Sequence, residues 1–211
     1  MTLRVAVLVS GEGSNLQALL DRAHGRDGVE VVAVASNRAT ARGLERARTA
    51  GVEAGVFDAS DYPDRGQRDD ALADWLEQRR VALIVLAGFM EILGAPFIRR
   101  FEGRIINVHP ALLPAFPGVR AIEQALDYGV KVVGVTVHFV DEGVDSGPII
   151  LQEAFDVVPY SRDIAAIEER IHEIEHRLLP RAVRLIAAGR VRIDPDAPRH
   201  VIVEGGNGGD D

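Results

Sequence analysis

Two polar residues stand at the end of an apolar run near the middle of the chain. Ile105 and Ile106 lead into Asn107, and His109 follows two positions later, directly before Pro110. Side chains two positions apart in a strand point to the same side, so the amide and the imidazole would face one crevice. Open α/β sheets bind ligands at the carboxyl ends of their strands. Both groups can donate hydrogen bonds to negative charge that develops on an oxygen, which favours a reactive site over a structural polar pair.

The segment after His109 is rich in proline. Pro110, Pro114 and Pro117 restrict the backbone, so this loop loses less entropy than a flexible one when it is held in place. The sequence leaves open whether Leu113-Pro114 is a cis bond in a tight turn.

A glycine-containing loop near the N-terminus has the form of an anion site. Gly11 and Gly13 lie between the first apolar strand and a helix predicted over Leu16–Ala23. Exposed backbone N–H groups and the helix dipole favour a phosphate at such a helix start. Ser14 and Asn15 would add side-chain donors, and either could cap the helix.

A dinucleotide site is not supported at this loop. Leu16 occupies the position of the third glycine in the dinucleotide motif. The second strand ends in Ser36-Asn37-Arg38, without an acidic residue for a ribose diol. The loop is therefore predicted to bind the phosphate of a ligand other than NAD.

Two further polar segments have ordinary interpretations. The acidic run 141–145 is typical of a turn, and its spacing does not support a metal site. His172-Glu173-Ile174-Glu175-His176 matches H-E-x-x-H, the zinc motif of metalloproteases. The third ligand and the glycine-linked loop of those enzymes are not evident, so no metal is predicted.

The order of elements predicts a single α/β domain over residues 1–200, followed by a disordered tail at 201–211. We expect a mostly parallel sheet with helices on both faces. Lys131–Val140 and Ile149–Val158 would add an antiparallel hairpin at its edge. The other strands are predicted at Leu3–Val9, Val29–Ala35, Glu53–Phe57, Ala82–Leu86 and Gly103–Asn107. The other helices are predicted at Ala41–Ala50, Asp69–Arg79, Pro96–Arg100, Ala121–Tyr128 and Arg162–Ala188.

Local signals refine this outline. Ser161 would cap the last helix, and Pro180 would kink or divide it. Residues 59–67, which include Arg65, are polar and predicted to be flexible. In the strand 131–140, Val132, Gly134, Thr136 and His138 fall on one face, and Val133, Val135, Val137 and Phe139 on the other.

Composition limits the class of protein. Apolar residues make up 47% of the 211 residues, enough for a sizeable core, and the net charge is −8. An acidic chain is not expected to bind nucleic acid, and no apolar run approaches the roughly 20 residues of a membrane span. The chain has no cysteine, and its start lacks a signal-peptide pattern. We therefore expect a cytoplasmic protein without nucleic-acid or membrane partners.

Several motifs together resemble the glycinamide ribonucleotide formyltransferases of the folate-dependent formyltransferase superfamily. The similarity runs from about residue 3 to residue 190. It rests on the segments 9–17, 86–90, 107–110, 112–114, 137–140 and 145–148.

The resemblance implies the formyltransferase fold, with a Rossmann-like sheet. It also implies transfer of a formyl group from 10-formyltetrahydrofolate to the amine of phosphoribosylglycinamide in purine synthesis, without a metal. By motif position, Asn107, His109 and Asp145 would be catalytic, with Asp145 favouring the protonated imidazole and handling a proton. The ribonucleotide would be held by Gly13, Ser14, Asn15, Leu16, Gln17 and Glu175. The folate would be lined by Arg65, Met90, Glu91, Ile92, Leu93, Asp141, Glu142, Gly143 and Val144. A homodimer is compatible with the resemblance.

Two positions depart from the pattern, and related activities stay open. Glu91 stands where family members often have arginine, and Ala115 where lysine is common; both changes remove positive charge near a polyanionic substrate. Formyltetrahydrofolate hydrolase and methionyl-tRNA formyltransferase share the Asn, His and Asp, but they resemble longer chains with an additional domain. A nucleotide-binding module without catalysis is the remaining alternative.

Overall fold

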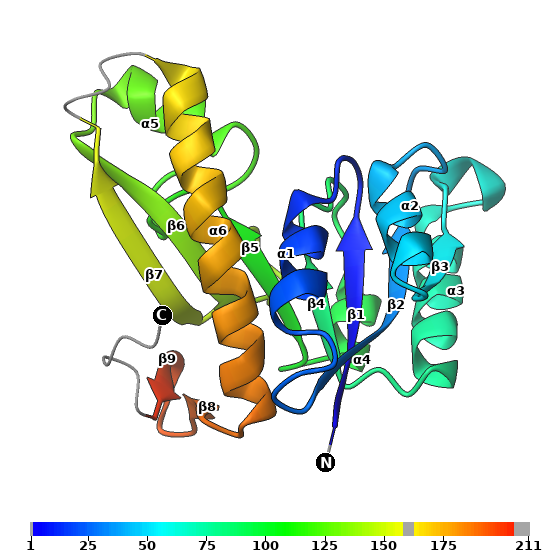
Figure 1. Cartoon of the computed structure of the whole chain (residues 1–211). Helices are drawn as coiled ribbons and strands as arrows, with labels where there is room; N and C mark the ends of the chain where they lie inside the picture. The colour runs from blue at the N-terminus through cyan, green and yellow to red at the C-terminus, as the bar shows by residue number, and fades with distance from the viewer. Residues whose placement is uncertain (1, 158–162, 205–211) are drawn as a thin grey trace.

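The computed structural model describes residues 2–157 and 163–204. Its main sheet has seven strands in the order β3-β2-β1-β4-β5-β6-β7 (Figure 1). The strands from β3 to β5 in that order pair in parallel, whereas β6 is antiparallel to both β5 and β7. The predicted mostly parallel sheet with an antiparallel edge hairpin is therefore confirmed. Its strands are β1 Leu3–Val9, β2 Val29–Ser36, β3 Glu53–Val56, β4 Leu83–Leu86, β5 Ile105–His109, β6 Val132–Phe139 and β7 Ile149–Asp156.

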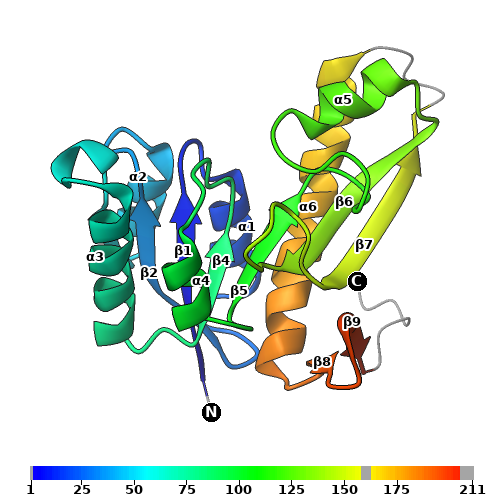
Figure 2. The same ribbon diagram turned by 180° about the vertical axis from the view of Figure 1, so that it is seen from behind.

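Helices cover both faces of this sheet. One face carries α1 Ser14–Arg22, α2 Arg42–Thr49, α5 Ala121–Tyr128 and α6 Ile164–Ala187, and the other carries α3 Arg65–Gln78 and α4 Ala95–Arg100 (Figures 1 and 2). Helices α1 and α6 lie side by side, so residues that are distant in sequence are neighbours there (Figure 1). None of the helices in the described part of the chain is long and apolar enough to cross a membrane.

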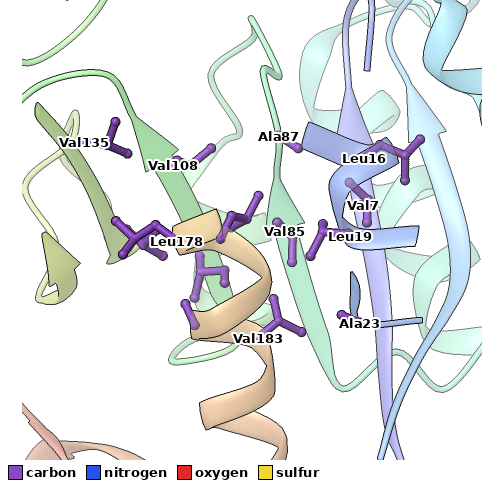
Figure 3. Packing of buried hydrophobic residues seen from close by; sticks show 14 of the residues in the cluster. Val7, Leu16, Leu19, Ala23, Val85, Ala87, Val108, Val135, Leu178 and Val183 are labelled. Carbon is purple, nitrogen blue, oxygen red and sulfur yellow. The ribbon is translucent and has the colours of Figure 1, made fainter. Parts of the chain in front are cut away.

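Successive side chains of β1 point to opposite faces of the sheet and pack into two separate hydrophobic clusters. Val7 packs with Leu16 and Leu19 of α1 on one face, where Leu178 of α6 joins the same cluster (Figure 3). Leu8 points the opposite way, into a cluster with α3 and α4. A strand buried on both faces needs apolar residues at every position, which explains the unbroken apolar run.

The start of α3 corrects one prediction. The segment 59–67 is not a flexible loop: a short 3₁₀ turn spans Ala59–Asp61, and α3 begins at Arg65. The Asp64 side chain accepts a 2.9 Å hydrogen bond from Gln67 N, and Gln67 Nε2 donates back to Asp64 Oδ2 at 3.0 Å. The Asp-x-x-Gln pattern is a helix-start signature that was readable in the sequence, although Gln67 here bonds to the side chain of Asp64 and not to its backbone N–H.

The last helix, α6, corrects the prediction about Pro180. Pro180 does not divide α6, which runs unbroken through that position. A proline removes one backbone N–H from the helix, and the buried side chains on either side keep both halves packed against the sheet. The N-cap is Asp163, whose side chain accepts from Ala166 N at 3.2 Å; the predicted cap Ser161 lies outside the described residues.

The C-terminal region corrects a third. β8 Val191–Asp194 and β9 Ala197–Val203 form a second, two-stranded antiparallel sheet, so the predicted tail is a strand at residues 201–203. The apolar residues Val201 and Val203 pack against the main core, which gives this segment a reason to be ordered. Residues 205–211 lie outside the described part, and the division into one domain stays a prediction.

Candidate active site

A cavity of about 320 Å³ opens at the carboxyl ends of β4 and β5. Its walls come from four stretches of chain that meet there, 88–93, 107–110, 118–121 and 140–146, together with His138. A volume of this size is within the usual range for a small-molecule site. The three predicted catalytic residues, Asn107, His109 and Asp145, all line it.

These three side chains contact one another. Asn107 Nδ2 donates to Asp145 Oδ1 at 3.2 Å, and His109 Nδ1 lies 3.4 Å from Asp145 Oδ2. Asn107 and His109 thus face the same side of β5, as their spacing predicted. His109 Nε2 is 2.8 Å from the carbonyl oxygen of Phe116 in the proline-rich loop. Each ring nitrogen of His109 therefore has an oxygen acceptor near it.

A second histidine belongs to this cluster, although sequence reasoning gave it no role. His138 is buried; its Nε2 lies 3.6 Å from Asp145 Oδ1 and 3.3 Å from Asn107 Nδ2. In the antiparallel register Asn107 pairs with His138, and His109 with Thr136. The polar face of the strand 131–140 was visible in its alternation, but the register that sets it against Asn107 was not.

Asp145 is held as an anion. Burial alone would raise its pKa, but the His138 hydrogen bond, the Gly118 N–H at 2.7 Å and the charge of His109 lower the pKa to about 2. A carboxylate with a lowered pKa contributes stability above its unfolded value near 4, and that contribution is lost only as the pH falls towards 2. Asp145 is therefore ionised throughout the physiological range, as a partner for an imidazolium must be.

The proline-rich loop is fixed by a buried threonine. Leu113 N donates to Thr136 Oγ1 at 3.1 Å, and that hydroxyl donates to the carbonyl of Ala111 at 2.7 Å. Gln152 Nε2 reaches the carbonyl of Leu113 at 2.9 Å. The Leu113-Pro114 peptide, left open by the sequence, is cis. This loop presents the carbonyl of Phe116 to the imidazole of His109.

The predicted phosphate loop lies at the start of α1. Gly13 is the N-cap residue, with φ of 72°, and no side chain caps the helix, contrary to the predicted role of Ser14 or Asn15. The backbone N–H groups of the first turn therefore have no side-chain acceptor at the cap, which suits an anion. Leu16 is wholly buried in the core, so it could contact a ligand only through its backbone. Gln17 Oε1 accepts a 3.1 Å hydrogen bond from Arg46.

Glu175 joins this loop from α6. Asn15 Nδ2 donates to Glu175 Oε2 at 2.9 Å, and both side chains are buried. Burial raises the pKa of Glu175, although the Asn15 hydrogen bond and the charge of His172 oppose this effect. A buried carboxylate with a single hydrogen bond can accept more bonds, as from ligand hydroxyls.

We expect Glu175→Gln to stabilise the free protein while weakening ribonucleotide binding. Because the folded-state pKa lies above 4.5, the carboxylate costs increasing stability as the pH rises from that value through the folded pKa. The amide can still accept from Asn15 but carries no charge to desolvate. The melting temperature of the variant relative to the wild type should therefore rise as the pH increases from 4.5 through the folded-state pKa. A difference that falls with pH would contradict this assignment.

The predicted folate residues divide into two groups. Met90, Glu91, Ile92, Leu93 and 141–144 all line the cavity. Arg65 is exposed at the first turn of α3 and is not among the residues that line it.

The H-E-x-x-H segment lies within α6. The rings of His172 and His176 stack with centroids 6.1 Å apart, and Glu175 between them turns to Asn15. Within residues 2–157 and 163–204, three or more His, Cys, Asp or Glu side chains do not gather in a way that could hold a metal ion.

The fold and the cavity define an α/β protein whose reactive groups stand at the carboxyl ends of a largely parallel sheet. Comparison with known proteins gives the family: the formyl transferase family matches residues 3–183, and the chain belongs to it.

Individual relatives agree. The chain is 47% identical over 205 residues to the trifunctional purine biosynthetic protein adenosine-3 of Drosophila pseudoobscura pseudoobscura, but this covers 94% of the chain and 15% of that protein. It is 40% identical to the phosphoribosylglycinamide formyltransferase of Haemophilus influenzae, covering 90% of each. Among solved structures, glycinamide ribonucleotide transformylase 1 from Symbiobacterium toebii is similar, with 49% identity, a TM-score of 0.90, and coverage of 96% of this chain and 94% of that one.

Proposed function

We propose that the chain transfers the formyl group of 10-formyltetrahydrofolate to the amine of phosphoribosylglycinamide, a step of purine biosynthesis. The observation that carries the proposal is the contact of Asn107, His109 and Asp145 in one cavity. The family membership and the names of the relatives support the same reaction.

The two substrates would approach the three residues from different sides. The ribonucleotide phosphate would bind the backbone of 13–17, and its ribose would bind Glu175. The folate would occupy the cavity between 90–93 and 141–144, where apolar side chains suit a flat ring system. The glycinamide amine and the formyl carbon would then meet beside Asn107 and His109.

The reaction would proceed by direct attack. The neutral amine bonds to the formyl carbon, and the carbonyl electron pair moves onto the formyl oxygen. The Asn107 amide donates to that oxyanion, and the positive charge of protonated His109 beside it stabilises it electrostatically. Asp145 favours the protonated form of His109 and relays the proton that the amine loses. That proton ends on the folate nitrogen as the bond between this nitrogen and the formyl carbon breaks. The products are formylated ribonucleotide and tetrahydrofolate.

The proposal is tested by the dependence of turnover on the acceptor. We expect the purified protein to form tetrahydrofolate from 10-formyltetrahydrofolate only when phosphoribosylglycinamide is present, as followed by the folate difference spectrum. Equal turnover with water alone would identify a hydrolase, and turnover that requires charged initiator tRNA would identify the tRNA-modifying activity.

A further inference from the structure

The loop 90–93 exposes its apolar residues and turns its acid inward. Met90 is 69% exposed and Ile92 is 67% exposed, whereas the side chain of Glu91 between them is 30% exposed. Solvent alone would favour the opposite arrangement, because burying the apolar side chains is favourable and burying a charge is costly. The orientation of Glu91 therefore needs a specific partner inside the protein.

That partner is a buried cation. Glu91 Oε2 forms an ion pair with Nη1 of Arg68, whose side chain is only 1% exposed. The other carboxylate oxygen, Oε1, accepts a 2.9 Å hydrogen bond from Asn37 Nδ2. Asp69 Oδ1 binds the remaining face of the guanidinium, through Nη2 at 2.6 Å and Nε at 3.0 Å. The guanidinium thus bridges α3 to the cavity loop, and loss of Glu91 would leave one of its edges unpaired.

The same cluster holds both ends of the loop by its backbone. Met90 N donates to Ser10 Oγ at 2.8 Å, and Gly94 N donates to Asp69 Oδ2 at 2.7 Å. The Ser10 hydroxyl donates in turn to Asn37 Oδ1 at 2.6 Å. Glu91 supplies the contact between these two anchors. The conformation of the cavity wall is thus set by polar groups behind it.

We propose that Arg68 and Glu91 are positioning residues for the folate side of the cavity, an inference that rests on the proposed function. Their ion pair holds the loop so that Met90 and Ile92 present apolar surface to the folate rings. Although Glu91 lines the cavity, its carboxylate is turned to Arg68 and Asn37 and is thereby held away from the polyanionic ligand. An arginine at position 91, common in the family that the sequence resembles, would meet the like charge of Arg68.

Removing the charge of Glu91 should change folate affinity in opposite directions, depending on whether Glu91 contacts the folate directly or positions the loop. If Glu91 faced the folate, its negative charge would repel the ligand, and removing the charge would tighten binding. If Glu91 positions the loop through Arg68, removing the charge loosens the wall and weakens binding. Glu91→Gln separates the two, because glutamine keeps the shape and can still accept from Asn37.

The test is the split between the two Michaelis constants of Glu91→Gln, with the exposed Glu102→Gln as the charge-matched control. We expect the KM for 10-formyltetrahydrofolate to rise about tenfold, because the loop loses its ion pair with Arg68, with kcat and the ribonucleotide KM within about twofold of wild type. Arg68→Lys, which cannot reach both carboxylates, should raise the same KM. Adding Glu91→Gln to Arg68→Lys should change it little further.

Three results would overturn the inference: an unchanged or lower folate KM, equal rises in both KM values, or additive effects of the two substitutions. Calorimetric binding of tetrahydrofolate to the same variants gives a readout that needs no turnover. A wild type that binds tetrahydrofolate but does not formylate the ribonucleotide would refute the proposed function and leave this inference to be decided by the binding series. A wild type that does not bind tetrahydrofolate would overturn both.

Discussion

Replacing Asp145 with asparagine is expected to lower kcat by roughly 10²–10³-fold, because the negative charge that favours protonated His109 beside the oxyanion is lost. Both KM values should change far less. Asp145 has a left-handed φ of 49°, which asparagine tolerates, and Asn can occupy the same space. The protein should therefore remain folded, as checked by circular dichroism.

The same logic predicts that the catalytic residues act as one unit. Asp145 is 3.4 Å from His109 and 3.2 Å from Asn107, so removing one member disables the role of the others. We expect His109→Ala combined with Asp145→Asn to be little worse than the worse single variant. Losses in kcat that multiply fully in the double variant would mean that Asp145 works independently of His109, and the charge-pair mechanism would have to be abandoned.

Replacing Gly13 with valine is expected to disable the phosphate loop. The residue has a φ of 72°, and a Cβ there would lie 2.7 Å from the Cα of Gly43 in α2. A side chain would also stand where the phosphate approaches the backbone. The variant should have a lower melting temperature, because a left-handed conformation costs about 1–2 kcal/mol for a residue with a side chain. Below that temperature, its ribonucleotide KM should rise more than its folate KM.

Gly11 provides a matched control for this substitution. It is in the same loop, has no positive φ, and a Cβ built on it meets nothing within 4 Å. Gly11→Ala should therefore melt like the wild type. If Gly13→Val instead raised the folate KM selectively, the two ligands would have been assigned to the wrong parts of the site.

The sequence was informative where burial and spacing act locally. The unbroken apolar run of Leu3–Val9 predicted a strand covered on both faces, and the spacing of Asn107 and His109 predicted two side chains on one side. Both features depend on backbone geometry within a few residues.

It was less informative where tertiary contacts decide. Pro180 leaves α6 continuous because packing on both sides outweighs one lost hydrogen bond. The C-terminal strand β9 is ordered because it pairs with β8 and because Val201 and Val203 pack against the main core. The Asp-x-x-Gln pattern at residues 64–67, by contrast, is a local signal for the start of α3 and could be read from the sequence.

The site shows the same division. His138 enters the catalytic cluster through the register of β6 against β5, and a register between distant strands is not written in either strand alone. Glu91 turns inward because Arg68 lies behind it, a pairing across 23 positions of sequence that spacing could not indicate.

The most direct test of the central claim follows the formyl carbon itself. 10-Formyltetrahydrofolate labelled with ¹³C at the formyl group would be incubated with the protein and phosphoribosylglycinamide, and the products identified by mass spectrometry. We predict that the label appears in the ribonucleotide, in one-to-one proportion with the tetrahydrofolate formed, and that Asp145→Asn slows its appearance without redirecting it. Label recovered as free formate, with an unmodified ribonucleotide, would contradict the account.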